Sequence, residues 1–257
     1  MVVPTDMQVD AGQRLLMRHA ASLGQAGLHT SVHVLVQGYH GLLDSLVTFL
    51  TSKGAGLVVM GSRALTAAPA ALGSAAPAST PASSVSLAVV KRLPMPVVLL
   101  TKNSRVAGTG PGSGGGGGGG RERRATPRVM AVVEPHARPM LKYLVDTCMD
   151  PARGDTLLLG QVFATRLLTL QQQKSARHLL ESWLDDATKA HLPVAKTTLD
   201  GPFDKALQSR SDGLQLLALQ LKSHDKNLPA DVLSLVRSSH APVMLFKSRA
   251  HAVHSTE

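Results

Sequence analysis

The sequence predicts an α/β fold made of two tandem doubly wound parallel-sheet domains. Three observations lead to this prediction. Short apolar runs alternate with amphipathic helical segments along both halves of the chain. The strand-like runs are continuously apolar, as in parallel strands that are covered on both faces. The two halves also end alike, with Pro96-Val-Val-Leu-Leu100 in the first and Pro242-Val-Met-Leu-Phe246 in the second.

The first half alternates strands and helices. Strands are expected over residues 32–36, 56–60 and 96–100. Helices are expected over residues 13–28, 42–53 and 84–93. The first strand is predicted from its β-branched valines. The second helix places Leu43 and Leu46 on one face, and Gly54 follows it, as glycine does at many helix ends. Ser83 or Ser84 supplies a cap for the third helix.

The second half repeats this alternation. Strands are expected over residues 128–133, 155–162, 194–199, 214–219 and 242–246. Helices are expected over residues 139–149, 174–191, 203–208 and 229–236. The longest of these helices has Leu180, Trp183 and Ala187 at helical spacing. The Gly154-Asp155 pair predicts the turn that opens the second strand.

The two halves match at two points. Gly56 aligns with Gly213 at an offset of 157 residues, and Val97 aligns with Val243 at an offset of 146. The first copy is therefore 11 residues longer between these points (157 minus 146). A loop rich in Ala, Pro, Ser and Thr, over residues 66–83, lies in that interval. We interpret the chain as a tandem duplication with one decorated copy.

Composition divides the chain into four parts. Residues 107–127 include seven consecutive glycines and are expected to form a flexible linker. This linker separates a first domain over residues 1–106 from a second domain over residues 128–249, and residues 250–257 form a tail. Both domains have the length of an ordinary folded unit.

The charge balance limits the kinds of partner. The chain has 27 Lys and Arg residues against 17 Asp and Glu, a formal net charge of +10, which attracts polyanions in general. Aromatic residues make up only 3 %, too few for a surface that stacks nucleobases. Nucleic-acid binding is therefore disfavoured.

The cysteine content and the apolar runs indicate the compartment. Cys148 is the only cysteine, which excludes a disulfide framework and indicates a reducing environment. We expect it to act as a buried small hydrophobic residue. No apolar run reaches the roughly 20 residues that span a bilayer. The first ten residues carry acids where a signal peptide has bases. A cytoplasmic protein without a membrane partner is expected.

The sequence favours neither a metal site nor catalysis. His29 and His33 stand four residues apart, but no further ligand stands at a useful spacing. Met60-Gly-Ser-Arg-Ala64 lacks the second glycine of a hydrolase nucleophile elbow. We therefore expect no metal and no enzymatic activity.

Six short pieces carry a further pattern. They are residues 56–63 (GLVVMGSR), 72–74 (LGS), 84–86 (SVS), 96–100 (PVVLL), 128–134 (RVMAVVE) and 154–162 (GDTLLLGQV). Their order and spacing resemble the universal stress protein family. The resemblance implies a five-stranded parallel sheet in each copy, found as dimers or as tandem pairs. It also implies a glycine loop after the fourth strand that holds the phosphates of ATP, because backbone N–H groups reach phosphate oxygens most easily without a Cβ.

Carried over to this chain, the resemblance implies a nucleotide site in the first copy. Its residues are Gly61, Ser62, Arg63, Gly73, Ser74, Ser84 and Val85, with the phosphate-contacting hydroxyl supplied by either Ser74 or Ser84. Ala64 replaces the middle glycine of the family pattern. In the second copy, Glu134 stands at the carboxylate position near the adenosine, but Leu217-Ala-Leu-Gln220 replaces the glycine loop. The alternative for Glu134 is a plain surface carboxylate.

Compared with the family pattern, the first copy lacks its first strand and first helix. It begins close to the second strand, with Met1-Val-Val-Pro4 interpreted as a remnant. A truncated start and evolutionary loss explain this equally well. The exposed sheet edge that results invites pairing. We expect the first copy to be completed by the second copy or by another chain.

These inferences support two functions. The first is a non-catalytic stress-response regulator that binds ATP or a related adenine nucleotide weakly through its first copy. The second is a nucleotide-free interaction or dimerisation scaffold with the same fold.

Overall fold

The computed structural model describes residues 6–25, 27–35, 41–61, 85–101, 103–104, 128–163, 169–222 and 228–247. Contacts divide the chain into two compact units, residues 1–54 and 55–257, and each is described by itself. The predicted loop, linker and tail lie outside the described residues. The domain boundaries inferred from the sequence therefore stay a prediction. Among the described helices, none is both long and apolar enough to cross a bilayer.

Unit 1 contains two helices, α1 (Asp6–Gln25) and α2 (Gly41–Ser52). Both confirm helices predicted from the hydrophobic spacing. Gly27 follows α1 in the left-handed conformation, with φ of 81°, and its N–H donates to the Gly24 carbonyl at 2.9 Å. This is a common way to end a helix, because glycine has no Cβ to clash there.

The strand predicted over residues 32–36 is wrong for the residues that the structure describes. Residues 32–35 belong to no strand, and Val36 lies outside the described residues. The ring of His33 packs instead on Phe49 of α2, with 5.1 Å between the ring centroids. A strand needs a neighbour that satisfies its backbone groups, and the described part of unit 1 holds no other strand.

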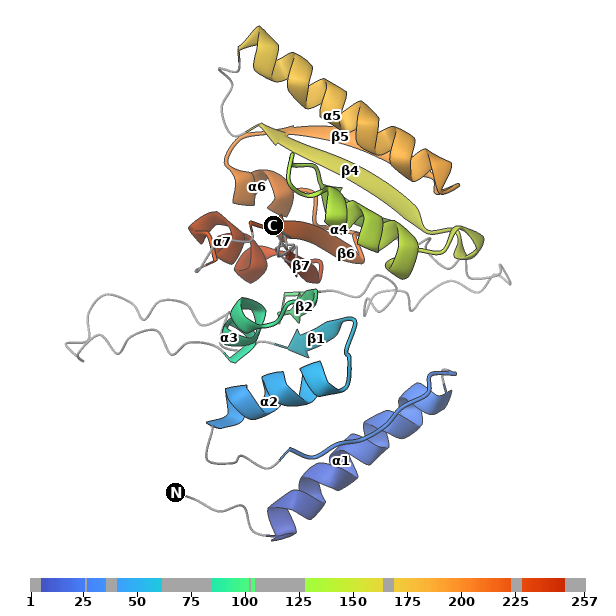
Figure 1. Ribbon diagram of the computed structural model, residues 1–257, viewed down its shortest axis with the longest axis vertical. Helices are drawn as coiled ribbons and strands as arrows, with labels where there is room; N and C mark the ends of the chain where they lie inside the picture. The colour runs from blue at the N-terminus through green and yellow to red at the C-terminus, as the bar shows by residue number, and fades with distance from the viewer. Residues whose placement is uncertain are drawn as a thin grey trace, which may run out of the picture. The chain divides into compact units, whose positions relative to one another are not determined.

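Unit 2 is built on one seven-stranded sheet (Figure 1). In chain order the strands are β1 (Val58–Gly61), β2 (Val97–Leu100), β3 (Arg128–Val132), β4 (Thr156–Phe163), β5 (Val194–Asp200), β6 (Leu216–Leu221) and β7 (Val243–Lys247). Across the sheet they follow the order β1-β2-β7-β6-β3-β4-β5. Every strand predicted in this unit is present, with ends displaced by at most two residues.

All neighbouring strands are parallel except β2 and β7, which pair antiparallel. The second half thus forms a five-stranded parallel sheet, and β1 and β2 of the first half extend it. The α/β class and the parallel sheets are confirmed. The sequence did not predict that β2 and β7 would join both halves in one continuous sheet, although pairing with the second copy was one of the two alternatives expected.

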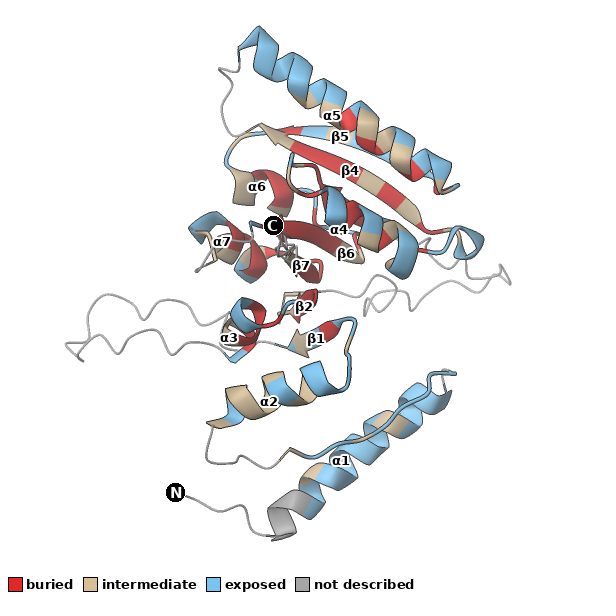
Figure 2. Ribbon diagram, in the orientation of Figure 1, coloured by how far each residue is buried: buried red, intermediate tan, exposed pale blue. Residues whose placement is uncertain are grey.

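Helices cover the sheet on both faces. They are α3 (Val85–Arg92), α4 (Arg138–Tyr143), α5 (Leu170–Lys189), α6 (Phe203–Gln208) and α7 (Ala230–Ser238). From β3 the chain continues to β4 and then β5 in one direction across the sheet. It then returns to the other side of β3, where β6 and then β7 follow in the opposite direction. Right-handed crossovers therefore place α4 and α5 on one face and α6 and α7 on the other. Figure 2 shows the buried residues concentrated in the central strands and on the inner sides of these helices.

The core under α4 and α5 is apolar. Trp183 of α5 and Leu144 are completely buried in it. The helix predicted over residues 139–149 is only partly α-helical, because α4 continues as a π-helical turn from Leu144 to Cys148. The hydrophobic spacing does not distinguish one type of turn from the other. Cys148 lies in this turn and is half-buried, and burial raises the pKa of its thiol, so the reactive thiolate is disfavoured.

The strand registers define how the two halves correspond. Val58 pairs with Val97 in the first half, and Leu217 pairs with Val243 in the second. The same backbone bond opens each pair: the Val58 N–H donates to the Pro96 carbonyl at 3.0 Å, and the Leu217 N–H donates to the Pro242 carbonyl at 2.9 Å. Val58 is thus equivalent to Leu217, an offset of 159 residues (217 minus 58). The alignment of Gly56 with Gly213 was wrong by two residues.

The order of elements extends this correspondence. The 20-residue helix α1 matches the 20-residue helix α5, α2 matches α6, and α3 matches α7. In the order of elements along the chain, the region that was predicted as a strand over residues 32–36 corresponds to β5 of the second half. Among the described residues, the first half has no counterpart of β3, α4 or β4. Met1 to Pro4, interpreted as a remnant, lie outside the described residues.

Candidate functional site

The candidate site is the crevice where the connections of the sheet change direction, between β3 and β6. In open α/β sheets, ligands bind at the carboxyl ends of the strands at such a point. Here Glu134 follows β3, Gln220 lies near the end of β6, and α7 begins beyond them. A cavity of about 260 Å³ opens there, lined by these residues together with His136, Lys222 and Asp231.

Gln220 is a buried residue in the lining of this crevice. Its side chain is 7 % exposed. Its Oε1 accepts a hydrogen bond from the Met140 N–H of α4 at 3.1 Å, and its Nε2 donates to the His136 carbonyl. The amide thus holds β6 to the segment that enters α4. Its oxygen and its nitrogen thus each have a protein partner.

Glu134 lies half-buried beside this amide. Its Oε2 is 3.3 Å from the Nε2 of His136, which is also 3.2 Å from the Gln220 carbonyl oxygen. Burial raises the pKa of the Glu134 carboxyl. The nearby His136 and Lys222 act in the opposite direction, and Asp231 adds to the rise. The carboxylate therefore lies within a mixed-charge cluster.

The internal repeat shows which residues of the first half stand in the same places. Gly61 pairs with Leu100 as Gln220 pairs with Phe246, so Gly61 is the counterpart of Gln220. Val85 opens α3 at the position that Asp231 takes in α7, with the 146-residue offset of β2 and β7. The matching burial of Ser86 and Val232, and of Val89 and Leu235, supports this alignment.

These replacements make the two halves chemically different. In the second half an amide fills the glycine position, and a carboxylate stands at the helix N-terminus, where it would repel phosphate. In the first half neither group is present. A Cβ built on Gly61 would meet no described atom within 4 Å, so packing among the described residues does not require a glycine there.

Of the predicted nucleotide-site residues of the first copy, the structure describes two. Gly61 is the last residue of β1, and Val85 is the first residue of α3. The other five, Ser62, Arg63, Gly73, Ser74 and Ser84, lie outside the described residues. The assembly of the full set into one site stays a prediction.

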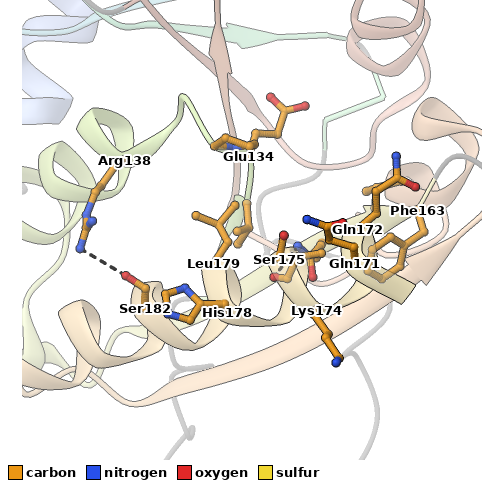
Figure 3. A pocket seen from close by; sticks show the side chains of 15 residues that line it. Glu134, Arg138, Phe163, Gln171, Gln172, Lys174, Ser175, His178, Leu179 and Ser182 are labelled. Carbon is orange, nitrogen blue, oxygen red and sulfur yellow. Dashed lines mark hydrogen bonds between the residues drawn. The ribbon is translucent and has the colours of Figure 1, made fainter. Parts of the chain in front are cut away.

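A second, larger cavity of about 1120 Å³ lies at the carboxyl ends of β3 and β4, beside α5. Figure 3 shows Leu179 and Ser175 of α5 directed into it, while Lys174 points away and the carboxylate of Glu134 is turned away from α5. At one end the Arg138 guanidinium donates to the Ser182 hydroxyl at 3.3 Å. Arg138 also pairs with Asp186, so its charge is already neutralised.

Gln161 of β4 is the residue of this cavity that sequence reasoning missed. It is 5 % exposed, and its Nε2 donates to the Ala176 carbonyl at 2.9 Å. Its Oε1 is buried and accepts no hydrogen bond in the described part of the chain. A single glutamine within an otherwise apolar strand was the available signal. The lining combines amide and hydroxyl side chains with the titratable Glu134 and His178.

No cluster of His, Cys, Asp and Glu side chains within the described ranges is arranged to hold a metal ion.

Comparisons with known proteins show which solved structures have a similar fold. No family model matches the chain, and no curated protein matches it in sequence. Among solved structures it is similar to a universal stress protein from Archaeoglobus fulgidus, with 16 % identity and a TM-score of 0.61, covering 95 % of this chain and 80 % of that one. It is also similar to a candidate universal stress protein from Pseudomonas aeruginosa, with 12 % identity and a TM-score of 0.56, covering 91 % and 77 %.

These identities are too low to carry over any activity, but the coverage includes both halves of the chain. The resemblance inferred from the short sequence motifs is thus matched by the three-dimensional arrangement. This chain has the fold of the universal stress proteins.

Proposed function

We propose that this protein is a non-catalytic, cytoplasmic regulator of the stress response that binds one adenine nucleotide per chain, weakly, through its first half. The site is the loop that follows β1, with Gly61, Ser62, Arg63, Gly73, Ser74, Ser84 and Val85 around the phosphates. The adenine specificity and the stress-response role follow from the resemblance to universal stress proteins.

The contrast between Gly61 and Gln220 is the observation that carries this proposal. At equivalent positions of the repeat, one half keeps a glycine that nothing described packs against, and the other half has an amide bonded on both sides. A ligand that approaches the backbone is a physical reason for a glycine with free space around it. The absence of a carboxylate at Val85 agrees with an anionic ligand at the start of α3.

Thermal unfolding with and without ATP tests the proposal. A ligand that binds only the folded protein raises the midpoint by mass action, so millimolar ATP should raise it for the natural protein. Gly61→Gln, which copies the residue of the second half, should abolish the shift, because the amide would occupy the phosphate position. Titration calorimetry should give one nucleotide per chain.

Gly12→Gln is the matched control. A Cβ on Gly12 of α1 also meets no described atom within 4 Å, so the same substitution is tolerated there and should leave the ATP shift unchanged. An absent shift in the natural protein at millimolar ATP would overturn the proposal.

The second candidate is the nucleotide-free scaffold. One observation favours it: the strand junction between β2 and β7 already makes an interface between the two halves of the chain. On this alternative, ATP has no effect on the midpoint of unfolding, while the continuous sheet still forms.

A further inference from the structure

The outer edge of β1 is open in the described part of unit 2. β1 is the terminal strand of the sheet, and its inner side pairs with β2. The Val58 N–H points inward and donates to the carbonyl of Pro96, the residue before β2. Because backbone groups alternate along a strand, the N–H and C=O groups of Val59 and Gly61 point outward. Such unpaired groups form a template for another strand.

The internal repeat shows what fits on such an edge. In the second half the same side of β6 is occupied by β3, which runs parallel to it and pairs Val129 with Leu216 and Ala131 with Ala218. Ala218 is completely buried, whereas its counterpart Val59 is 58 % exposed. The first half therefore lacks, among its described residues, the strand and the following helix that cover the equivalent edge of the second half.

The two edges of the sheet differ in how they meet solvent. At the opposite edge, β5 carries Lys196, which pairs with Glu181 of α5, and ends at Asp200. Charges of this kind keep edge strands from pairing with other chains. β1 carries no charged residue, and its Val59 and the preceding Leu57 are exposed and apolar. The β1 edge therefore lacks the protection that the β5 edge has.

Two further segments of the sequence are unsuited to this place. Residues 66–83 are rich in Ala and Pro, and residues 107–127 are rich in Gly, so neither has the composition of a buried strand. Each chain has one β3–α4 segment, and it already belongs to the second half. A second copy could therefore lend that segment only by opening its own sheet.

We propose that the outer edge of β1 docks a segment of another polypeptide that consists of an apolar strand followed by a short amphipathic helix. The strand runs parallel to β1 and bonds to the backbone of Val59 and Gly61. The helix covers Val59, as α4 covers the sheet in the second half. This mode of binding takes its affinity from main-chain hydrogen bonds and its specificity from the apolar side chains on both faces of the strand.

A peptide with the sequence of residues 128–149 tests the proposal, because it contains the strand and helix that occupy the equivalent edge. Fluorescently labelled peptide is titrated with the full-length protein and followed by anisotropy. Saturable binding is expected, and a scrambled peptide should not bind. Val59→Lys should weaken binding about ten-fold or more, because the ammonium group would be covered by the docked segment.

Two variants make the result specific to this edge. Ala195→Lys puts the same charge at an exposed position on β5, and binding should stay unchanged. Val59→Thr keeps the β-branched shape and should retain binding. Circular dichroism of each variant checks that the sheet is intact.

Absence of binding to the natural protein would overturn the proposal, and so would binding that survives Val59→Lys. A dimer in light scattering that Val59→Lys dissociates would also overturn it, since a second copy would then occupy the edge. The titration contains no nucleotide, so its outcome is independent of the proposed ATP site.

Discussion

Val98 and Met244 lie directly opposite each other in the antiparallel pair of β2 and β7, and they are also equivalent positions of the internal repeat, 146 residues apart. On either side of this pair, Val97 opposes Leu245 and Leu99 opposes Val243. With the 146-residue offset, Val97 is equivalent to Val243 and Leu99 to Leu245, so the two contacts are symmetric copies of each other. A local two-fold axis therefore passes between Val98 and Met244. The junction is an isologous interface of the kind that symmetric dimers form, contained within one chain.

This junction protects the last strand of each half. Val98 is 7 % exposed, and Met244 is completely buried. Without the pairing, β2 and β7 would both be apolar edge strands. The continuous sheet is therefore the means by which each half covers the edge of the other.

Replacing both residues should reveal their contact. Met244→Ala is expected to lower the free energy of unfolding by about 2–5 kcal/mol, because it leaves a cavity in the core. Val98→Ala should lower it less, since fewer atoms are removed. The double variant should deviate from additivity by about 0.5–3 kcal/mol, as neighbours across a strand pair do. Urea unfolding measures all three.

The control combines Val98→Ala with Leu192→Ala, near β5 at the far edge of the sheet, and the two effects on the free energy of unfolding should be additive. Additive effects of Val98→Ala and Met244→Ala would contradict the symmetric contact.

Gln220→Ala should destabilise the second half. The substitution removes the side-chain donor to the His136 carbonyl and leaves the Met140 N–H with only its second acceptor, the Ala137 carbonyl at 3.1 Å. The expected loss is about 1–3 kcal/mol in the free energy of unfolding. Gln171→Ala, at an exposed position of α5, is the control and should change it by less than about 0.5 kcal/mol. An equal effect of the two variants would show that the amide does not hold β6 to α4.

Glu134→Gln should change how stability depends on pH. Burial raises the pKa of this carboxyl, so the folded state favours its protonated form. That contribution is fully present below the pKa of the unfolded chain and is lost as pH rises through the folded value. The amide avoids this loss. The variant should therefore be more stable than the natural protein at neutral pH, and the difference should vanish near pH 4 and below.

Unfolding midpoints measured in urea between pH 4 and pH 7 check this prediction. The control Glu181→Gln removes an exposed carboxylate that pairs with Lys196, so it should not make the protein more stable at neutral pH. A Glu134→Gln variant that is less stable at neutral pH would mean that the attraction of His136 and Lys222 outweighs the cost of burial.

Asp155→Asn should destabilise the turn that opens β4. The buried carboxylate accepts hydrogen bonds from the Asp150 N–H at 2.9 Å and from the Arg153 Nε at 2.9 Å. The bond from Arg153 is the main cause of the lowered pKa of Asp155. Its stabilisation is present above the ordinary pKa of aspartate and is lost as pH falls through the lower folded value.

At neutral pH the Asp155→Asn variant should therefore lose about 1–3 kcal/mol in the free energy of unfolding, and the difference should shrink in acid. Asp186→Asn, which removes the partly exposed partner of Arg138, should cost less than about 1 kcal/mol. Urea unfolding at pH 7 and pH 3 distinguishes the two. Equal losses would show that burial of Asp155 adds nothing.

Much of the secondary structure was predictable because the signals are local. The prolines before β2 and β7 mark where these strands begin, and the spacing of Leu180, Trp183 and Ala187 identifies the buried face of α5. Gln220 was also recognised as part of the segment that replaces the glycine loop. What it does there was not predictable, because its partners Met140 and His136 lie at least 80 residues away.

The failures have the same origin. The valines over residues 32–36 have strand propensity, but no neighbouring strand in the described part of unit 1 pairs with them. Gly56 and Gly213 look alike in sequence, yet the pairing of Val58 with Val97 shifts the true correspondence by two residues. Local sequence similarity does not reveal strand register, because hydrogen bonds between distant segments determine it.

From sequence alone, this protein could be recognised as a duplicated α/β chain whose halves keep different parts of one pattern, because hydrophobic period and glycine placement are read over a few residues. Only the tertiary structure decided that β2 and β7 meet about a two-fold axis, that the Gln220 amide joins β6 to the segment before α4, and that β1 is the last strand of the described sheet. Each of these depends on which distant backbones come within hydrogen-bonding distance, and that depends on the packing of the whole sheet.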